Sequence, residues 1–166
     1  VRALGQACDV PAIGAHAAPR LFMVDASTFF SHAELREEHF GPVAIVVRAD
    51  AREMADAARR FDGQLTASIH ADAADESWAS ELVTVLIEKA GRLIWNGYPT
   101  GLAVTPATMH GGPYPASTSS LHSSVGVTAI RRFLRPVSFQ AFPDTLLPPE
   151  LRGGNPLGIP RDEGGA

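Results

Sequence analysis

The sequence predicts an α/β fold in which mostly parallel strands are joined by crossover helices. Two observations support this prediction. From residue 21 to residue 95, short apolar runs alternate with helix-like segments, and the run Val43–Val47 is apolar throughout and rich in β-branched residues. The alternation is typical of parallel sheets covered by helices. A continuous apolar run is typical of a strand buried on both faces of such a sheet.

The first elements follow from local residue preferences. Leu21–Val24 is a short apolar run and predicts a strand, and a Gly-Pro turn directly precedes the second strand, Val43–Val47. Asp50 is a suitable N-cap, and the Ala-rich segment 52–60 that follows favours a helix. The order strand, strand, helix is therefore expected here, with residues 1–19 irregular apart from a little helix.

The next elements are predicted to be a strand, a helix and another strand. Residues 65–69 predict a strand, and Asp75 or Ser77 is a suitable N-cap for the helix that follows. That helix has one apolar face, because its large side chains recur at helical spacing: Trp78, Leu82, Val85, Leu86 and Ala90. A glycine ends it, and Leu93–Trp95 predicts another strand.

Pro and Gly dominate much of the remaining chain. Residues 97–123 predict a long functional loop. Residues 125–134 favour a helix that ends in arginines, and Val137–Phe142 favours a strand. From residue 143 the composition predicts a tail with little regular structure. The expected domains are therefore residues 1–134 and a C-terminal strand and tail at 135–166.

The composition argues against several functions. The formal net charge is −4 and no Lys/Arg run is present, so a nucleic-acid partner is not expected. No apolar stretch approaches the roughly 20 residues that a membrane span needs. Cys8 is the single cysteine, which excludes a disulfide framework or Cys-based zinc site within the chain and fits a cytoplasmic location. The histidines lack metalloprotease spacing, so no metal site is expected.

The run from Glu37 to Val43 holds the strongest functional signal. The carboxylate of Glu38 can accept hydrogen bonds from two sugar hydroxyls, as acidic residues do in dinucleotide sites. Phe40 offers a flat apolar face to an aromatic ring. The alternative is a solvated acidic patch that leads into a turn and a core strand.

This Glu-Glu-X-Phe-Gly-Pro-Val run, followed by an apolar strand, resembles the signature of the aldehyde dehydrogenase family. The resemblance covers residues 19–142 and implies a three-layer, mostly parallel α/β catalytic domain, of which the chain is the C-terminal part. It implies that Val137–Phe142 is an oligomerisation strand in a homo-oligomer. It also implies NAD or NADP as cofactor, with Glu38 holding the nicotinamide ribose and Phe40 contacting the nicotinamide.

Segments 96–101 and 109–117 most resemble one subgroup of that family, the α-ketoglutaric semialdehyde (2,5-dioxovalerate) dehydrogenases. The resemblance implies a small aldehyde substrate and makes Thr100 and His110 the candidate substrate-binding residues. Most aldehyde dehydrogenases carry Phe before the Gly-Gly pair, where this sequence has His110. The alternative for His110 is an ordinary surface histidine in a Gly-rich turn.

The catalytic nucleophile of aldehyde dehydrogenases is a cysteine thiolate. Cys8 is a poor candidate, because the family's nucleophile lies far upstream of the glutamate run and Cys8 is only 30 residues before Glu38. No catalytic residue is therefore expected in this chain. The first hypothesis is a fragment of an NAD(P)+-dependent, aldehyde-oxidising enzyme that is inactive alone. The alternative is a non-catalytic oligomerisation or assembly module, which would use the 137–142 strand as an edge.

Overall fold

The computed structural model describes residues 1–6, 14 and 16–162. The chain forms two compact units, Val1–Arg132 and Phe133–Ala166. All strands found in the described residues belong to the first unit. No helix in the described part of the chain is long and apolar enough to cross a membrane.

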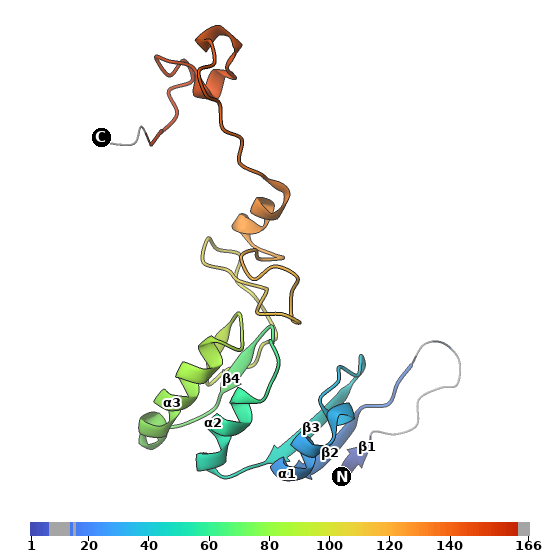
Figure 1. Cartoon of the computed structure of the whole chain (residues 1–166). Coiled ribbons are helices and arrows are strands. Elements are labelled where there is room, and N and C mark those ends of the chain that lie inside the picture. Colours follow the sequence, from blue (N-terminus) through green and yellow to red (C-terminus); the bar gives the residue numbers. More distant parts are fainter. Residues whose placement is uncertain (7–13, 15, 163–166) are drawn as a thin grey trace. The chain divides into compact units, whose positions relative to one another are not determined.

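A three-stranded mixed sheet begins the first unit (Figure 1). Its strands, in spatial order, are β1 (Arg2–Gln6), β2 (Arg20–Asp25) and β3 (Val43–Arg48). β2 and β3 are parallel, and β1 pairs with β2 in the antiparallel sense. The short helix α1 (Ala26–Ser31) and a 3-10 helix at Ala33–Leu35 lie in the connection between β2 and β3. The structure therefore confirms β2 and β3, whereas the expectation that residues 1–19 are irregular is wrong for β1.

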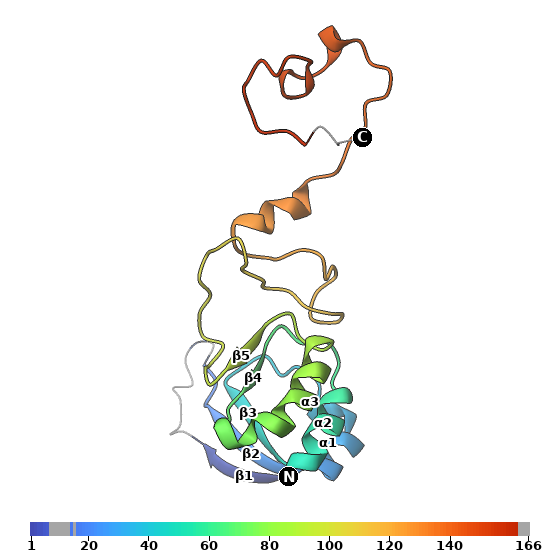
Figure 2. The same cartoon turned by 90° about the vertical axis from the view of Figure 1, so that its left-hand side faces the viewer.

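A second, two-stranded parallel sheet follows along the chain. Its elements, with the preceding helix, are α2 (Ala51–Arg59), β4 (Ala67–Ile69), a 3-10 turn at Ala73–Asp75, α3 (Glu76–Ile87) and β5 (Leu93–Trp95). α3 crosses over between β4 and β5, and α2 lies beside α3 (Figure 2). Each of these helices and strands appears where the residue pattern predicts it.

Two apolar clusters form the core of the first unit. One joins α2, β4 and α3 through Ala58, Ile69, Leu82 and Val85. The other joins β2 and α1 through Val24, Phe29 and Phe30, with partly buried apolar side chains packed around it, including Ile45, Val47, Ala57 and Phe61. Because Ala57 and Ala58 belong to different clusters, α2 connects the two. The predicted apolar face of α3 is confirmed at Leu82 and Val85.

The prediction that β3 is buried on both faces is wrong for this chain. Ile45 and Val47 pack against the aromatic cluster, whereas Val43 and Val46 are 42% and 39% exposed. Successive side chains of a strand point to opposite faces, so Val46 lies on the face away from Ile45 and Val47, whereas Val43 shares their face and is exposed at the start of the strand. The described residues thus form an α/β unit with mixed and parallel sheets, and the third layer stays a prediction.

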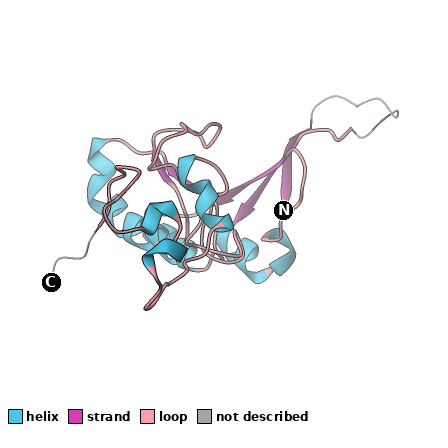
Figure 3. Ribbon diagram, turned by 90° about the horizontal axis from the view of Figure 1, so that it is seen from above, coloured by secondary structure: helices cyan, strands magenta, loops and turns pink. Residues whose placement is uncertain are grey.

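After β5 the described residues contain no further strand (Figure 3). The helix expected at 125–134 is a 3-10 helix, Val127–Phe133, and the tail holds two 3-10 turns, Asp144–Leu146 and Pro149–Leu151. The strand predicted at Val137–Phe142 is absent from the single chain, whose backbone is irregular there. A strand needs a neighbour for its backbone N–H and C=O groups, and this segment has none among the residues that the structure describes.

Candidate functional site

Glu38 and Phe40 lie in the turn that leads into β3. The ring of Phe40 is 100% exposed, and Glu38 is also exposed. The turn is held from its backbone: the Arg20 N–H donates to the Pro42 carbonyl at 2.9 Å, so pairing with β2 starts directly after the turn. Among the described residues, the Glu38 carboxylate has no hydrogen-bond or ion-pair partner. The turn therefore exposes the Glu38 carboxylate as a hydrogen-bond acceptor and the ring of Phe40 as an apolar surface. Its backbone is held against the sheet by the hydrogen bond between Arg20 and Pro42.

The long loop after β5 is fastened to the core at points where two backbones come very close. A Cβ atom on Gly63 would overlap the Pro113 carbonyl, and one on Gly91 would overlap the Gly111 carbonyl. Gly112 approaches the carbonyl of Gln64 in the same way. Only glycine allows such an approach. These contacts place the Gly-Gly pair of the loop against the ends of α2 and α3.

His110, next to that pair, is held by two serines. Its backbone N–H donates to Ser123 Oγ at 2.9 Å, and the Ser124 N–H donates to its carbonyl at 2.8 Å. Its ring Nδ1 lies 2.8 Å from Ser124 Oγ. The side chain is half-buried. His110 is therefore a fixed part of the loop and not a freely rotating surface histidine.

A hollow of about 580 Å³ opens beside His110. Ten residues line it: Leu65, His110, Gly111, Ala116, Ser117, Thr118, Ser119, His122, Ser124 and Arg132. Glu38, Phe40 and Thr100 are not among them. The structure thus brings His110 together with His122, a residue that the sequence pattern did not single out because an isolated histidine among serines carries no spacing signal.

Thr100 lies exposed on the first part of the same loop. The following residue, Gly101, is tied to the start of β5, because Arg92 Nη1 donates to its carbonyl at 2.9 Å. Close by along the chain, the rings of His70 and Tyr98 lie 4.9 Å apart between centroids, at the carboxyl ends of β4 and β5. The carboxyl edge of parallel strands is where α/β proteins bind ligands. That rule could have singled out His70 and Tyr98, which sequence analysis missed.

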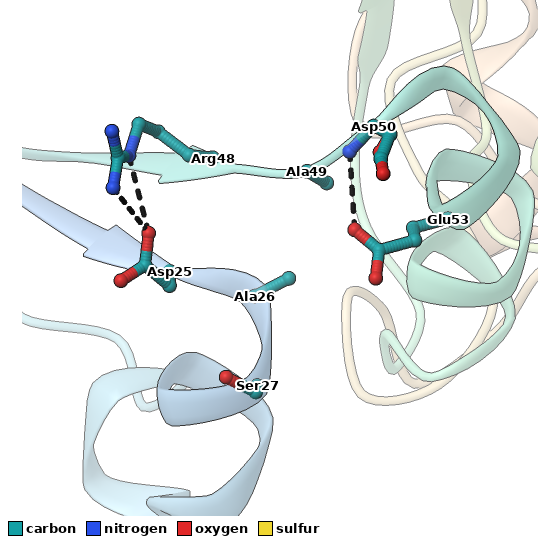
Figure 4. Close-up of a pocket in the computed structure, with 7 residues that line it drawn as sticks. All are labelled: Asp25, Ala26, Ser27, Arg48, Ala49, Asp50 and Glu53. Carbon is teal, nitrogen blue, oxygen red and sulfur yellow. Dashed lines mark hydrogen bonds and ion pairs between the residues drawn. The ribbon is translucent and has the colours of Figure 1, made fainter.

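A second hollow, of about 410 Å³, lies at the carboxyl ends of β2 and β3 (Figure 4). There the guanidinium of Arg48 binds Asp25, with Nη2–Oδ1 at 2.7 Å and Nε–Oδ1 at 3.1 Å. The Asp50 N–H donates to the Glu53 carboxylate at 3.1 Å, which confirms Asp50 as the N-cap of α2. These bonds connect the two strand ends and cap a helix, and both roles are structural.

The resolved pKa shifts are those of Glu34, Arg59 and Asp75, none of which is a candidate site residue. Hydrogen bonds from the Trp78 indole N–H and the Asp72 backbone N–H lower the pKa of Asp75. Hydrogen bonds to Glu81 and Asp56 raise the pKa of Arg59. In the described part of the chain no group of three His, Cys, Asp or Glu side chains is placed to hold a metal ion. Cys8 lies outside the described residues.

Comparison with known proteins identifies relatives, among them two proteins of the same name, although no protein-family profile matches the chain. Alpha-ketoglutaric semialdehyde dehydrogenase 2 of Azospirillum brasilense is 49% identical over 142 residues, which are 85% of this chain and 27% of that protein. Alpha-ketoglutaric semialdehyde dehydrogenase of Acinetobacter baylyi is 45% identical over 161 residues, 96% of this chain and 30% of that protein. The chain spans less than a third of either relative. At this identity over most of its length, the chain is homologous to part of an aldehyde dehydrogenase.

Proposed function

We propose that this chain is the C-terminal section of the catalytic domain of an NAD(P)+-dependent enzyme that oxidises α-ketoglutaric semialdehyde (2,5-dioxovalerate) to the carboxylic acid. The observation that carries the proposal is the 45–49% identity to two proteins named for that substrate. The chain covers only part of those proteins, so their activity comes to it by homology and needs a direct test. A cytoplasmic location belongs to the same proposal, since a single cysteine suits a reducing compartment.

The turn before β3 fits a nicotinamide nucleotide. The Glu38 carboxylate is exposed and free to accept hydrogen bonds from the hydroxyls of the nicotinamide ribose, and the bare ring of Phe40 two residues later suits contact with a planar ring. Glu38 and Phe40 would hold the nicotinamide group here, and that group would supply the acceptor for the hydride of the aldehyde. Glu38 and Phe40 fix the position of the ring and shield one side of it from water.

The second contribution of this chain to the enzyme is part of the wall of the substrate pocket. His110 is held by Ser123 and Ser124, and Thr100 lies on the same loop beside the tied Gly101. We place both residues against the aldehyde substrate. The nucleophile and general base come from sequence outside this chain. The chain therefore positions the reactants and does not attack the aldehyde.

The test compares the chain with the full-length protein that contains it. Absorbance at the wavelength of reduced nicotinamide is followed with α-ketoglutaric semialdehyde and NAD+ or NADP+. We expect steady oxidation by the full-length protein and none by the isolated chain. Full-length protein without activity on this aldehyde would refute the substrate assignment, and activity of the isolated chain that Cys8→Ser abolishes would refute the assignment of the nucleophile.

A non-catalytic assembly module is the second candidate. It is favoured by the apolar side chains Val137, Phe139 and Phe142, which are 56%, 39% and 51% exposed on a segment without strand partners. Such side chains suit a strand that pairs with another subunit. Glu38→Gln in the full-length protein separates the two candidates, because it slows hydride transfer if this chain holds the cofactor and leaves it unchanged if the chain serves assembly alone.

A further inference from the structure

The helices next to the three-stranded sheet lie on one side of it (Figure 2). Val24 of β2 packs with α1 in the aromatic cluster, and Val47, its neighbour on β3, packs against the same cluster. Ala57 on α2 and Phe61 directly after it reach that cluster as well. α1 and α2 therefore both cover the face of the sheet that carries Val24.

The opposite face of the sheet carries apolar side chains. Side chains alternate along a strand, so Leu21 and Met23 point away from the face of Val24. Their neighbours in the parallel register on β3 are Ala44 and Val46. Leu21 and Val46 are each 39% exposed, Ala44 is exposed and Met23 is half-buried. These four residues, Leu21, Met23, Ala44 and Val46, form the bare face of the sheet.

A bare apolar face is not a usual surface for parallel strands. Parallel sheets occur almost only where both faces are covered, because helices connect their strands. The bare face is also bordered by charged groups: Arg2 is the cross-strand neighbour of Met23, and the ion pair of Asp25 with Arg48 lies one step beyond Val46 on the same face. An apolar patch with a polar border marks a surface that another element covers.

The described helices do not supply the cover. α1 and α2 lie on the other face, and α3 packs against α2. A second copy of the chain would bring another bare sheet, whereas the usual cover of parallel strands is helical. The chain spans 27% and 30% of its two relatives, so most of each relative lies outside it and is long enough to supply further helices.

We propose that the bare face is the docking surface for an amphipathic helix of the same polypeptide, from the section that precedes this chain. The apolar side of that helix packs across Leu21, Met23 and Val46. The proposal rests on the proposed function, in which the chain is the C-terminal section of a longer enzyme. Because β3 begins directly after the turn that carries Glu38 and Phe40, this packing also fixes the position of the turn in the enzyme.

The first test measures the exposure of Met23 by oxidation with hydroxyl radicals and mass spectrometry, in the full-length protein and in the chain alone. We expect Met23 to be oxidised about tenfold more slowly in the full-length protein, because its thioether is covered there. Met54, which is 38% exposed on α2, is the matched control, and its rate should agree within about twofold. Equal rates for Met23 in both proteins overturn the proposal. Protection of Met23 that grows with the concentration of the chain alone assigns the face to a second copy and overturns it as well.

The second test uses the full-length protein only, so it does not depend on the folding of the chain alone. Photo-methionine replaces methionine with little added bulk, and the peptide cross-linked to position 23 identifies the occupant of the bare face. We expect a peptide that precedes Val1 in the same polypeptide. Mixed light and heavy protein distinguishes this from a cross-link to another subunit, and a cross-link to another subunit, or none, refutes the proposed occupant.

A substitution in the same protein completes the test. Val46→Lys places a charge on the bare face, and Val46→Ile keeps that face apolar. We expect Val46→Lys to lower the melting temperature by about 5 °C or more and Val46→Ile to stay within about 2 °C of wild type. A lysine that leaves both the melting temperature and the oxidation of Met23 unchanged contradicts the proposal. None of these measurements uses turnover, so a full-length protein that does not oxidise the aldehyde refutes the proposed function alone.

Discussion

The side-chain amide of Asn96 forms two hydrogen bonds with the backbone of Ala71. Oδ1 accepts from the Ala71 N–H at 2.9 Å, and Nδ2 donates to the Ala71 carbonyl at 2.8 Å. The Asn96 N–H also donates to the Ile69 carbonyl at 2.8 Å. One side chain thus extends the pairing of β4 with β5 beyond the last residues of both strands, at the edge from which the long loop departs.

Removal of the Asn96 side-chain amide should destabilise the carboxyl edge of the β4–β5 sheet. Asn96 has φ of 50°, a left-handed conformation that Asn tolerates better than Ala. Asn96→Ala loses both hydrogen bonds and strains the backbone, so we expect a loss of about 1–3 kcal/mol in the free energy of unfolding. Asn96→Gly removes the hydrogen bonds without the steric strain and separates the two effects. Urea titration of each variant gives the values, and an unchanged midpoint for both would show that the Asn96–Ala71 pair does not stabilise the edge.

Gly91 should be essential for docking of the long loop. An alanine Cβ at this position would overlap the Gly111 backbone carbonyl, which cannot move aside as a flexible side chain can. We expect Gly91→Ala to cost about 1–3 kcal/mol. Gly101→Ala is the matched control, because a Cβ there meets nothing within 4 Å, and its effect should stay within about 0.5 kcal/mol. Thermal melts of both variants provide the measurement. Equal melting temperatures would mean that the loop does not depend on this close approach.

Much of the first unit could be predicted, because local patterns set it. Helical periodicity located α3, and the cap at Asp50 located the start of α2. In contrast, β1 was missed because it is defined by a long-range pairing: Arg2–Gln6 pairs with a strand that begins at Arg20, and the register of that pairing shifts between Ala3 and Gly5. The strand expected at Val137–Phe142 is absent from the described residues, and its pairing with another subunit stays a prediction.

The candidate site could also be predicted only in part from the sequence. The Glu38–Phe40 run was found from its residue order, and the structure shows it as an exposed turn. His122 was not found, because its position beside His110 depends on how a loop without regular structure folds back. Asn96 was seen only as a strand end, and its bonds to Ala71 depend on the parallel register of β4 and β5.

The stability of α3 should depend on pH through Asp75. Its pKa is lowered below the ordinary value of 3.8, first by the indole N–H of Trp78 and then by the Asp72 N–H. A carboxyl whose pKa is lowered in the folded state contributes stability above its unfolded pKa and loses it as pH falls through the lowered value. Trp78→Phe removes the main donor. The difference in the free energy of unfolding between Trp78→Phe and the wild type should be largest near neutral pH. It should become smaller below a pH of about 4. A difference that stays constant from pH 7 to acid would assign the effect to packing alone.

Glu38→Gln should slow hydride transfer in the full-length enzyme. The substitution keeps the shape of the side chain and removes its charge, which weakens hydrogen bonds to the ribose by about 1–2 kcal/mol. Hydride transfer should suffer more than substrate binding, because the nicotinamide is less well positioned. Single-turnover kinetics and the cofactor Kd measure this. Glu37→Gln, which changes the neighbouring carboxylate, is the matched control. If both variants behave like wild type, Glu38 does not bind the ribose.

The segment Val137–Phe142 should become a strand when it meets another subunit. Val137 and Phe139 occupy alternate positions, so in a strand they would share one face, and both are exposed in the single chain. The rings of Phe139 and Phe142 contact each other with centroids 5.3 Å apart, which leaves their remaining apolar surface for a partner. Phe139→Pro removes one backbone donor and fixes φ, so we expect it to weaken the oligomer more than it lowers the melting temperature of the first unit. Phe139→Leu keeps the donor and most of the apolar surface, and it should retain the native mass. Light scattering of the full-length protein across a dilution series makes the comparison. An unchanged mass for Phe139→Pro at every concentration would exclude this segment from the interface, because a strand paired with another subunit cannot lose a ladder donor without effect.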